Sequence, residues 1–172
     1  QGVQGVMVAH LDVPVLTDEP GLPVSLSHKV TTDLLQKELK FKGLVFTDAL
    51  NMKGASDFSP DGDVSLKALL AGNDVLVIPN DLGLSIAHLS DALKKGVLTE
   101  ARLAHSVKKI LGAKYDLGLD QYAPVPLNGL TKALNQPIYK QTIEKAYAQA
   151  ATYVSQTDAT PIVLKPSDKV AF

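Results

Sequence analysis

Three short apolar runs alternate with helical segments, and this alternation constrains the fold more than any other feature of the sequence. The runs are Gly5–Val13, Gly43–Leu50 and Asp74–Pro79. The third run, DVLVIP, is apolar on both faces, which is typical of strands in a parallel sheet covered by helices. Strand–helix alternation of this kind predicts an α/β fold.

Helical periodicity fills the segments between and after these runs. Val30, Leu34 and Leu39 recur at helical spacing after Ser27, a residue type that favours helix N-termini. The helices predicted in this way cover residues 27–40, 65–71, 83–96, 98–119 and 136–156. Three strands are too few to close an eight-stranded barrel and would leave open sheet edges. The residues by themselves therefore leave two architectures open, a small open α/β unit or a part of a barrel.

Composition excludes several classes of protein. Hydrophobic residues make up 45% of the 172 residues and charged residues 20%, so the chain can bury a core and disorder is not expected. The net charge of −1 gives no electrostatic reason to bind nucleic acid or an anionic membrane, and there is no cysteine for a disulfide or a thiolate metal site. No apolar run is long enough to span a bilayer. Since the chain starts without Met or a signal-peptide pattern, we expect a processed or excised piece of a longer protein.

An aspartate, Asp48, stands where the second apolar run ends, directly after Thr47. In α/β barrels, residues at the carboxyl ends of strands line the active site. An ionised carboxylate there can act as a nucleophile or stabilise a cationic transition state. The alternative is structural, because Asp48 or Thr47 could instead cap the short helix that follows.

Polar residues also end the other two strands. His10, after the first strand, is a candidate for hydrogen bonding to a substrate, although a lone histidine is more often structural. Asn80 and Asp81 end the third strand and are predicted to cap a helix or form a turn. The other three histidines lack metal-ligand spacing, and no glycine-rich phosphate motif occurs.

The stretch ELKFKGLVFTDALNMKGA, residues 38–55, resembles family 3 glycoside hydrolases, specifically their β-N-acetylglucosaminidase (β-N-acetylhexosaminidase) branch. That branch has an ELGF-type turn before a strand and a [ST]D.L.M.G motif after it. Four more segments resemble the family in the same order, so that the similarity covers most of residues 5–119. They are GVMVAH, PVSLSHKVTTDLLQKEL, KALLAGNDVLVIPND and RLAHSVKKILGAKYDLGL. The resemblance implies the C-terminal portion, about three β/α units, of a TIM-type (β/α)8 barrel.

The first aspartate of the family motif is the catalytic nucleophile, so the resemblance implies that role for Asp48. It further implies a retaining exo-glycosidase that releases terminal β-linked N-acetylglucosamine from a saccharide or a peptidoglycan fragment. The KHFPGHG and DSH motifs of the branch, which supply substrate-binding residues and a His/Asp acid/base, do not occur in this sequence. We therefore expect a companion, the N-terminal half of the same barrel, to supply them, and we expect the chain alone to be inactive.

Two other interpretations of the sequence stay open. One is a family 3 β-glucosidase or β-xylosidase, although that branch usually has an aromatic residue directly after the nucleophile, where this sequence has Ala49. The other is a non-catalytic carbohydrate-binding or scaffold fragment, which an unpaired sheet edge would favour.

The predicted organisation has three parts. Residues 1–119 form the barrel portion, residues 120–168 a linker with one helix, and residues 169–172 the start of a second α/β sandwich domain, by similarity to two-domain members of the family. Such enzymes are often exported, which favours a periplasmic or extracellular location. Side chains and water suffice for the implied chemistry, so no metal or organic cofactor is expected.

Overall fold

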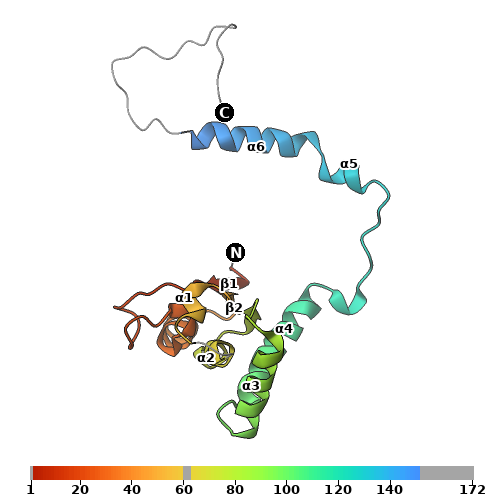
Figure 1. The fold of residues 1–172 in the computed structure, drawn as a ribbon. Helices are drawn as coiled ribbons and strands as arrows, with labels where there is room; N and C mark the ends of the chain where they lie inside the picture. The colour runs from red at the N-terminus through yellow and green to blue at the C-terminus, as the bar shows by residue number, and fades with distance from the viewer. Residues whose placement is uncertain (1, 60–62, 152–172) are drawn as a thin grey trace, which may run out of the picture. The chain divides into compact units, whose positions relative to one another are not determined.

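Three parallel strands form the centre of the fold, as the apolar runs predicted. The structure is a computed structural model that describes residues 2–59 and 63–151. The strands are β1 (Gly5–Val8), β2 (Leu44–Ala49) and β3 (Val75–Val77), arranged in the order β1-β2-β3. Both neighbouring pairs are parallel, and Figure 1 shows β1 and β2 beside each other. The predicted α/β class is confirmed.

Helices connect the strands and follow them along the chain. In order they are η1 (Val24–Leu26), η2 (Lys29–Glu38), α1 (Lys53–Ser56), α2 (Asp63–Ala71), α3 (Leu82–Lys94), α4 (Glu100–Asp116), η3 (Leu119–Gln121), α5 (Leu130–Leu134) and α6 (Pro137–Ala150). The segments η1 and η3 are short 3-10 helices. Thr99 caps α4, because its hydroxyl oxygen accepts a hydrogen bond from the Arg102 N–H at 3.1 Å.

Helix η2 occupies the place of the first predicted helix but has the wider π winding. In this winding a backbone N–H bonds five residues back, as the Leu39 N–H does to the Leu34 carbonyl oxygen at 2.9 Å. The hydroxyls of Thr31 and Thr32 donate to carbonyl oxygens of η1 and α2, at 3.1 and 2.7 Å. Apolar spacing predicted a helix here, whereas its winding and its attachment depend on contacts between distant parts of the chain.

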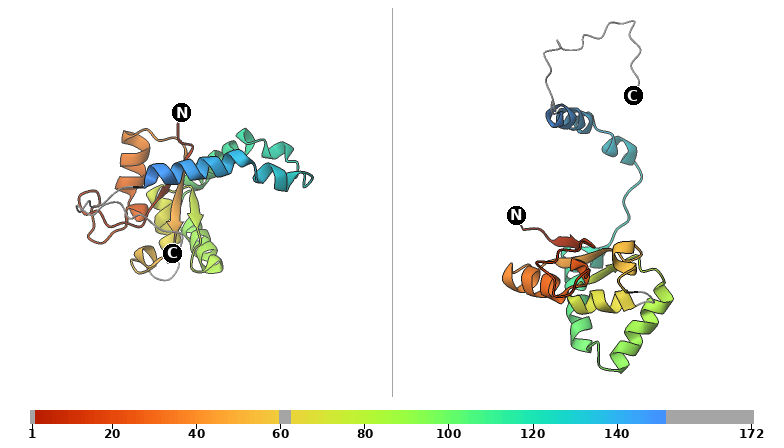
Figure 2. Two further views of the ribbon diagram at one scale, coloured as in Figure 1. Left: turned by 90° about the horizontal axis from the view of Figure 1, so that it is seen from above. Right: turned by 60° about the vertical axis from the view of Figure 1, so that its left-hand side comes forward.

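The two faces of the sheet differ in what covers them. Val45 and Thr47 of β2 are fully buried, and η2 and α2 lie against this face (Figure 2). Successive side chains of a strand point to opposite faces, so Phe46 and Asp48 lie on the other one. There Met7 is 61% exposed. We call this second face, which carries Gly5, Met7, Leu44, Phe46 and Asp48, the open face.

Three apolar clusters fill the space between the sheet and its helices. The first two join β1, β2, η1, η2 and α2, and the third joins α2 to α3. Their buried members are Val8, Val24, Leu26, Val45, Leu50, Ala55, Val64, Ala68, Leu69, Ala92 and Leu98. Burial of these side chains, at about 25 cal/mol per Å² of apolar surface, fixes which face of the sheet points away from the helices.

The turn that leads into β2 depends on Gly43. A Cβ atom at this position would stand 2.3 Å from the carbonyl oxygen of Gln4 and 2.6 Å from Cζ of Phe41. The same Gln4 carbonyl accepts a hydrogen bond from the Leu44 N–H at 2.9 Å. Glycine is therefore the residue that lets the chain pass this close to the segment before β1.

The amino ends of β2 and β3 are tied to α4 through a buried aspartate. Asp74 precedes β3, and its side chain is 1% exposed. Its Oδ1 accepts a hydrogen bond from the Ser106 hydroxyl at 2.6 Å, and its Oδ2 accepts from the Val45 N–H at 3.0 Å and from Lys109 Nζ. Arg102 donates to Ser106 Oγ at 2.7 Å. We call Asp74, Arg102, Ser106 and Lys109 the amino-end cluster.

Arg102 also holds the backbone that leads into β3. Its guanidinium donates to the carbonyl oxygens of Leu69 and Asn73, at 3.1 and 2.7 Å. Burial lowers the pKa of Arg102 below its ordinary value, and the negative charge of Asp74 opposes that shift. The closing helix of the unit is thus attached to two strands by charged groups rather than by apolar contacts alone.

The chain divides into two compact units, Gln1–Tyr122 and Ala123–Phe172. The described part of the second unit contains α5 and α6, and α6 lies within the helix predicted at residues 136–156. The assignment of residues 1–119, 120–168 and 169–172 to barrel, linker and second domain stays a prediction, and residues 169–172 lie outside the described part. Within residues 2–59 and 63–151, no helix has both the length and the apolar character needed to cross a membrane.

Candidate active site

Asp48 lies near the carboxyl end of β2, on the open face, and is half-buried. Its Oδ1 accepts a hydrogen bond from the Ala49 backbone N–H at 2.8 Å. In the part of the chain that the structure describes, no Lys, Arg or His lies within ion-pair distance of this carboxylate. None of these cationic side chains therefore forms an ion pair with Asp48. Its position at the carboxyl end of a strand is the one that catalytic residues occupy in barrel enzymes.

The capping alternative for this aspartate is wrong. Helix α1 begins after Met52, whose side chain makes no capping bond, so neither Asp48 nor Thr47 caps it. Asp48 bonds the adjacent peptide, and the Thr47 hydroxyl bonds β3.

A β-bulge lies between Phe46 and Ala49, in the part of β2 that contains Asp48. Phe46 pairs with Val75 and Ala49 pairs with Val77, so β2 takes three steps where β3 takes two. The Thr47 hydroxyl oxygen accepts a hydrogen bond from the Val77 N–H at 2.9 Å, which replaces a backbone acceptor in the ladder. A hydroxyl at position 47 thus satisfies the donor that the bulge would otherwise leave unpaired.

His10 lies next to β2, the strand that contains Asp48. Residue 10 stands two positions after Val8, which pairs with Thr47, so it is level with Ala49. Its Nε2 lies 3.1 Å from the Ala49 carbonyl oxygen, and its Nδ1 lies 2.6 Å from Ser25 Oγ. The structure brings the two predicted site residues to the same end of the sheet, and the substrate-binding role predicted for His10 stays a prediction.

Backbone strain occurs where β3 ends. Ile78 has φ +42°, a left-handed conformation that costs an L residue roughly 1–2 kcal/mol. Its carbonyl oxygen accepts a hydrogen bond from the Asn51 N–H at 3.1 Å, and the Val77 carbonyl accepts from the Leu50 N–H at 2.8 Å. Strained residues of this kind cluster at functional sites, and this one holds the segment that follows Asp48.

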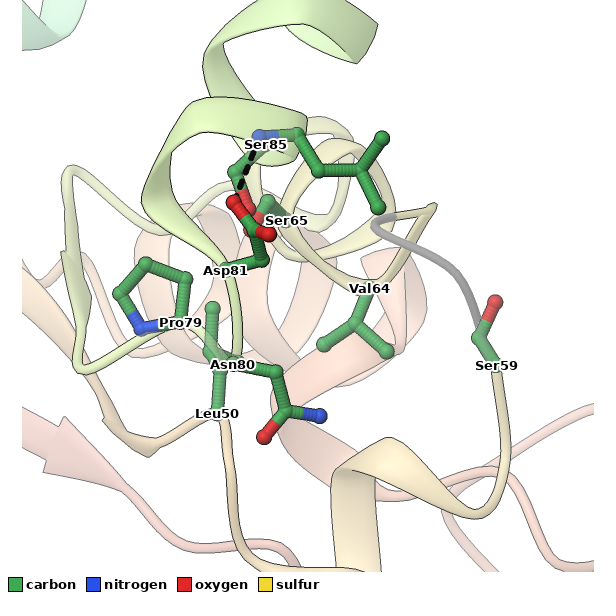
Figure 3. A pocket seen from close by; sticks show the side chains of 9 residues that line it. Leu50, Ser59, Val64, Ser65, Pro79, Asn80, Asp81 and Ser85 are labelled. Carbon is green, nitrogen blue, oxygen red and sulfur yellow. Dashed lines mark hydrogen bonds between the residues drawn. The ribbon is translucent and has the colours of Figure 1, made fainter.

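Asp81 has the capping role that was predicted for it, because its Oδ1 accepts a hydrogen bond from the Leu84 N–H at the start of α3, at 2.8 Å. It also borders a cavity of about 230 Å³ (Figure 3). The lining residues are Leu50, Ser59, Val64, Ser65, Pro79, Asn80, Asp81, Leu84 and Ser85. Neither Asp48 nor His10 lines this cavity. We therefore place the candidate chemistry at Asp48 and not in the cavity.

Metal ligation finds no support in the described residues. Within residues 2–59 and 63–151, no group of three or more His, Asp or Glu residues is placed to hold a metal ion.

In barrels of parallel strands and helices, the active site lies at the carboxyl ends of the strands. The sheet described above is part of such a (β/α) barrel, as its similarity to solved barrel enzymes shows. The model of the family described as "Glycosyl hydrolase family 3 N terminal domain" matches residues 1–113. The chain belongs to glycosyl hydrolase family 3.

Two curated relatives match nearly the whole chain. A "Beta-N-acetylglucosaminidase/beta-glucosidase" of Cellulomonas fimi is 28% identical over 163 residues, which are 90% of this chain and 29% of that protein. "Beta-hexosaminidase A" of Pseudoalteromonas piscicida is 27% identical over 175 residues, covering 91% of this chain and 29% of that protein.

A solved family 3 β-N-acetylglucosaminidase from a Paenibacillus species is 33% identical with a TM-score of 0.68, and the match covers 73% of this chain and 24% of that one. The chain therefore spans less than a third of the length of each of these three proteins. The predicted family and the predicted fold class are confirmed.

Sequence reasoning missed three features of the site and its support. Ser25 is a polar residue inside the apolar segment PVSL, which was a signal that its hydroxyl has a partner. The strain at Ile78 has no signal in the residue type, because isoleucine rarely adopts positive φ. The amino-end cluster had a signal, since Arg102, Ser106 and Lys109 recur at spacings of four and three and share one face of a helix.

Proposed function

We propose that this chain is the nucleophile-bearing part of a retaining exo-glycosidase that hydrolyses terminal β-linked N-acetylglucosamine. The observation that carries the proposal is the place of Asp48, which lies at the carboxyl end of β2, on the open face, without an ion-pair partner among the described residues. Membership of family 3 supports glycoside hydrolysis, and the names of the relatives support the sugar.

In the proposed reaction, Asp48 attacks the anomeric carbon of the sugar as the bond to the leaving oxygen breaks. A general acid donates its proton to that oxygen, and a covalent glycosyl-enzyme forms on the Asp48 carboxylate. The same acid/base group then removes a proton from water, which attacks the anomeric carbon and releases the sugar with its configuration retained.

The general acid/base belongs, in this proposal, to the N-terminal part of the same barrel. The open face supports this, because Met7 is 61% exposed on a face that would line the interior of a closed barrel. The share of the relatives that this chain covers, 24–29%, also supports a partner segment. The chain alone is then expected to be inactive, and we call the chain combined with that segment the completed barrel.

The test is the Asp48→Asn variant of the completed barrel, assayed with 4-nitrophenyl β-N-acetylglucosaminide. Loss of the nucleophile is expected to lower kcat by on the order of 10³-fold or more, and mass spectrometry of quenched wild-type enzyme should find the sugar on the peptide that contains Asp48. The product released first should be the β anomer, as followed by NMR. An unchanged turnover number in Asp48→Asn would refute the assignment.

A second candidate is a β-glucosidase, favoured by the double name of the Cellulomonas fimi relative. Ala49, a small residue directly after Asp48, favours the N-acetylglucosaminidase, as argued from the sequence. Rates with nitrophenyl β-glucoside and β-xyloside separate the two, since the proposal requires the acetamido sugar to have the highest kcat/KM. Saturable sugar binding without any turnover would favour the non-catalytic alternative.

The partner segment has its own test, which is native mass spectrometry of a sample that contains this chain. A bound companion of half-barrel mass is the expected result. A chain that stays alone when the N-terminal segment is supplied would contradict the proposed partner.

A further inference from the structure

We propose that His10 is a positioning residue, which holds the backbone that carries Asp48 instead of contacting the sugar. The inference rests on the proposed role of Asp48. Its geometric basis is independent of that role, because both ring nitrogens of His10 lie within hydrogen-bond distance of protein atoms.

The hydrogen-bond chemistry of the ring fixes which nitrogen carries the proton. The Ala49 carbonyl oxygen can only accept, so His10 Nε2 donates to it across 3.1 Å. In the neutral ring Nδ1 is then an acceptor, and the Ser25 hydroxyl donates to it across 2.6 Å. Each nitrogen therefore has a protein partner and neither is left for a substrate.

The position of Ser25 shows toward which side of the sheet the ring turns. Ser25 belongs to η1 and is fully buried, and its carbonyl oxygen accepts a hydrogen bond from the Asn73 side chain at 2.8 Å. The ring of His10 thus lies between this buried helix and the β2 backbone. Asp48 points to the open face instead, so His10 reaches it only through the peptide of Ala49.

The rest of the segment after Asp48 is held just as closely. A Cβ atom at Gly54 would stand 3.0 Å from the His10 carbonyl oxygen, so this glycine packs against the His10 backbone. On the other side, the Leu50 and Asn51 N–H groups bond carbonyl oxygens of β3 and the residue after it. The bond from Nε2 to Ala49 is therefore a side-chain contact between the segment after β1 and the peptide next to Asp48.

Loss of that bond should affect the chemical step and leave substrate binding intact. A misplacement of about 1 Å at a reacting group costs on the order of 10²-fold in rate. We therefore expect kcat to fall in the completed barrel without His10, while KM stays unchanged.

Three substitutions separate the two hydrogen bonds. In His10→Gln the amide nitrogen takes the place of Nε2 and can still donate to Ala49, whereas in His10→Asn the shorter side chain reaches only toward Ser25. We expect kcat of His10→Gln to stay within about threefold of wild type, and kcat of His10→Asn and His10→Ala to fall by about 10- to 100-fold. The matched control is His105→Gln, an exposed histidine of α4, which should leave kcat and KM unchanged.

Either of two kinetic results would overturn the proposal. A raised KM with unchanged kcat in His10→Ala would make His10 a substrate-binding residue, and unchanged kinetics in all three variants would leave it without a role. These outcomes differ from failure of the proposed function, in which Asp48→Asn itself keeps its activity.

A measurement without activity tests the geometry in the 172-residue chain. Imidazole ¹⁵N NMR at alkaline pH should show His10 fixed with the proton on Nε2, and the ¹³C shift of the Ala49 carbonyl should move in His10→Ala but not in His10→Gln. A proton on Nδ1, or a ring that exchanges between the two tautomers, would contradict the hydrogen bonds on which the proposal stands.

Discussion

Two aspartates at opposite ends of the same sheet are held in opposite ways. Asp74, at the amino end, is almost fully buried and bonds Val45, Ser106 and Lys109. Asp48, at the carboxyl end, is half-buried and bonds the neighbouring Ala49 N–H. In barrel enzymes the amino ends of the strands serve stability and the carboxyl ends serve chemistry.

The difference shows that the surroundings of an aspartate determine whether it stabilises the fold or stays available for a reaction. Strand alternation places Asp48 on the open face, and none of the ion pairs of the described residues includes it. Asp74 instead meets α4, whose Arg102, Ser106 and Lys109 share one face of the helix. A carboxylate that already bonds several groups is poorly suited to attack a sugar, whereas one without a cation beside it is suited to do so.

The largest expected effect on stability comes from the buried member of the pair. Asp74→Asn removes the buried negative charge that pairs with Lys109 and accepts a hydrogen bond from Ser106. We therefore expect a loss of about 3 kcal/mol in the free energy of unfolding. Urea unfolding followed by circular dichroism measures it.

Asp48→Asn is the matched control for that measurement. It should change the free energy of unfolding by no more than about 0.5 kcal/mol, since Asp48 has no ion pair among the described residues to lose. Equal losses in the two variants would erase the distinction between the two ends of the sheet.

A substitution at Thr47, in the bulge, should have a smaller effect on stability, and the effect can be followed at a single amide. Thr47→Val keeps the volume of the side chain and removes the acceptor of the Val77 N–H, so we expect a loss of about 1 to 3 kcal/mol. Amide hydrogen exchange at Val77 should be faster in Thr47→Val and protected in Thr47→Ser, which keeps the hydroxyl. If both variants exchange at the wild-type rate, the hydroxyl does not hold the bulge.

A third aspartate, Asp33 on η2, is expected to contribute least to stability, because its ion pair is exposed. The hydrogen bond from the exposed Lys37 holds the pKa of Asp33 below its ordinary value. The ionised carboxylate therefore stabilises the fold above the ordinary carboxyl pKa, and this contribution is lost as the pH falls through the lowered value.

Lys37→Met should raise the pKa of Asp33, as measured by NMR titration of its side-chain carboxyl carbon. Because both side chains are exposed, the free energy of unfolding at neutral pH should change far less in Lys37→Met than in Asp74→Asn. A pKa of Asp33 that does not move in Lys37→Met would show that the pair does not form in solution.

Much of this fold follows from local patterns in the sequence. The apolar runs predicted three strands, and helical spacing predicted a helix at residues 98–119, where α4 lies. Asp48 could be placed at a strand end because the run LVF stops just before Thr47. These inferences depend only on residues close to one another in the chain.

What the sequence did not predict depends on residues that are distant in the chain. The bond from His10 to Ala49 spans 39 positions, and it exists because β1 and β2 pair in one particular register. The carboxylate partner of Lys109, Asp74, lies 35 positions earlier in the chain. Register and helix placement are properties of the packed molecule, so no local pattern contains them.

Two glycine positions of this chain differ in how well they tolerate a side chain. Nothing lies within 4 Å of a Cβ placed at Gly112 in α4, so evolution or a mutant library can put alanine there and gain helix propensity. At Gly43 the Gln4 carbonyl oxygen would stand 2.3 Å from the same atom. A larger side chain there would have to displace the Gln4 backbone before β1 and the ring of Phe41. Position 43 is therefore one where substitution disturbs the fold, and it lies five residues before Asp48, for which we propose the catalytic role.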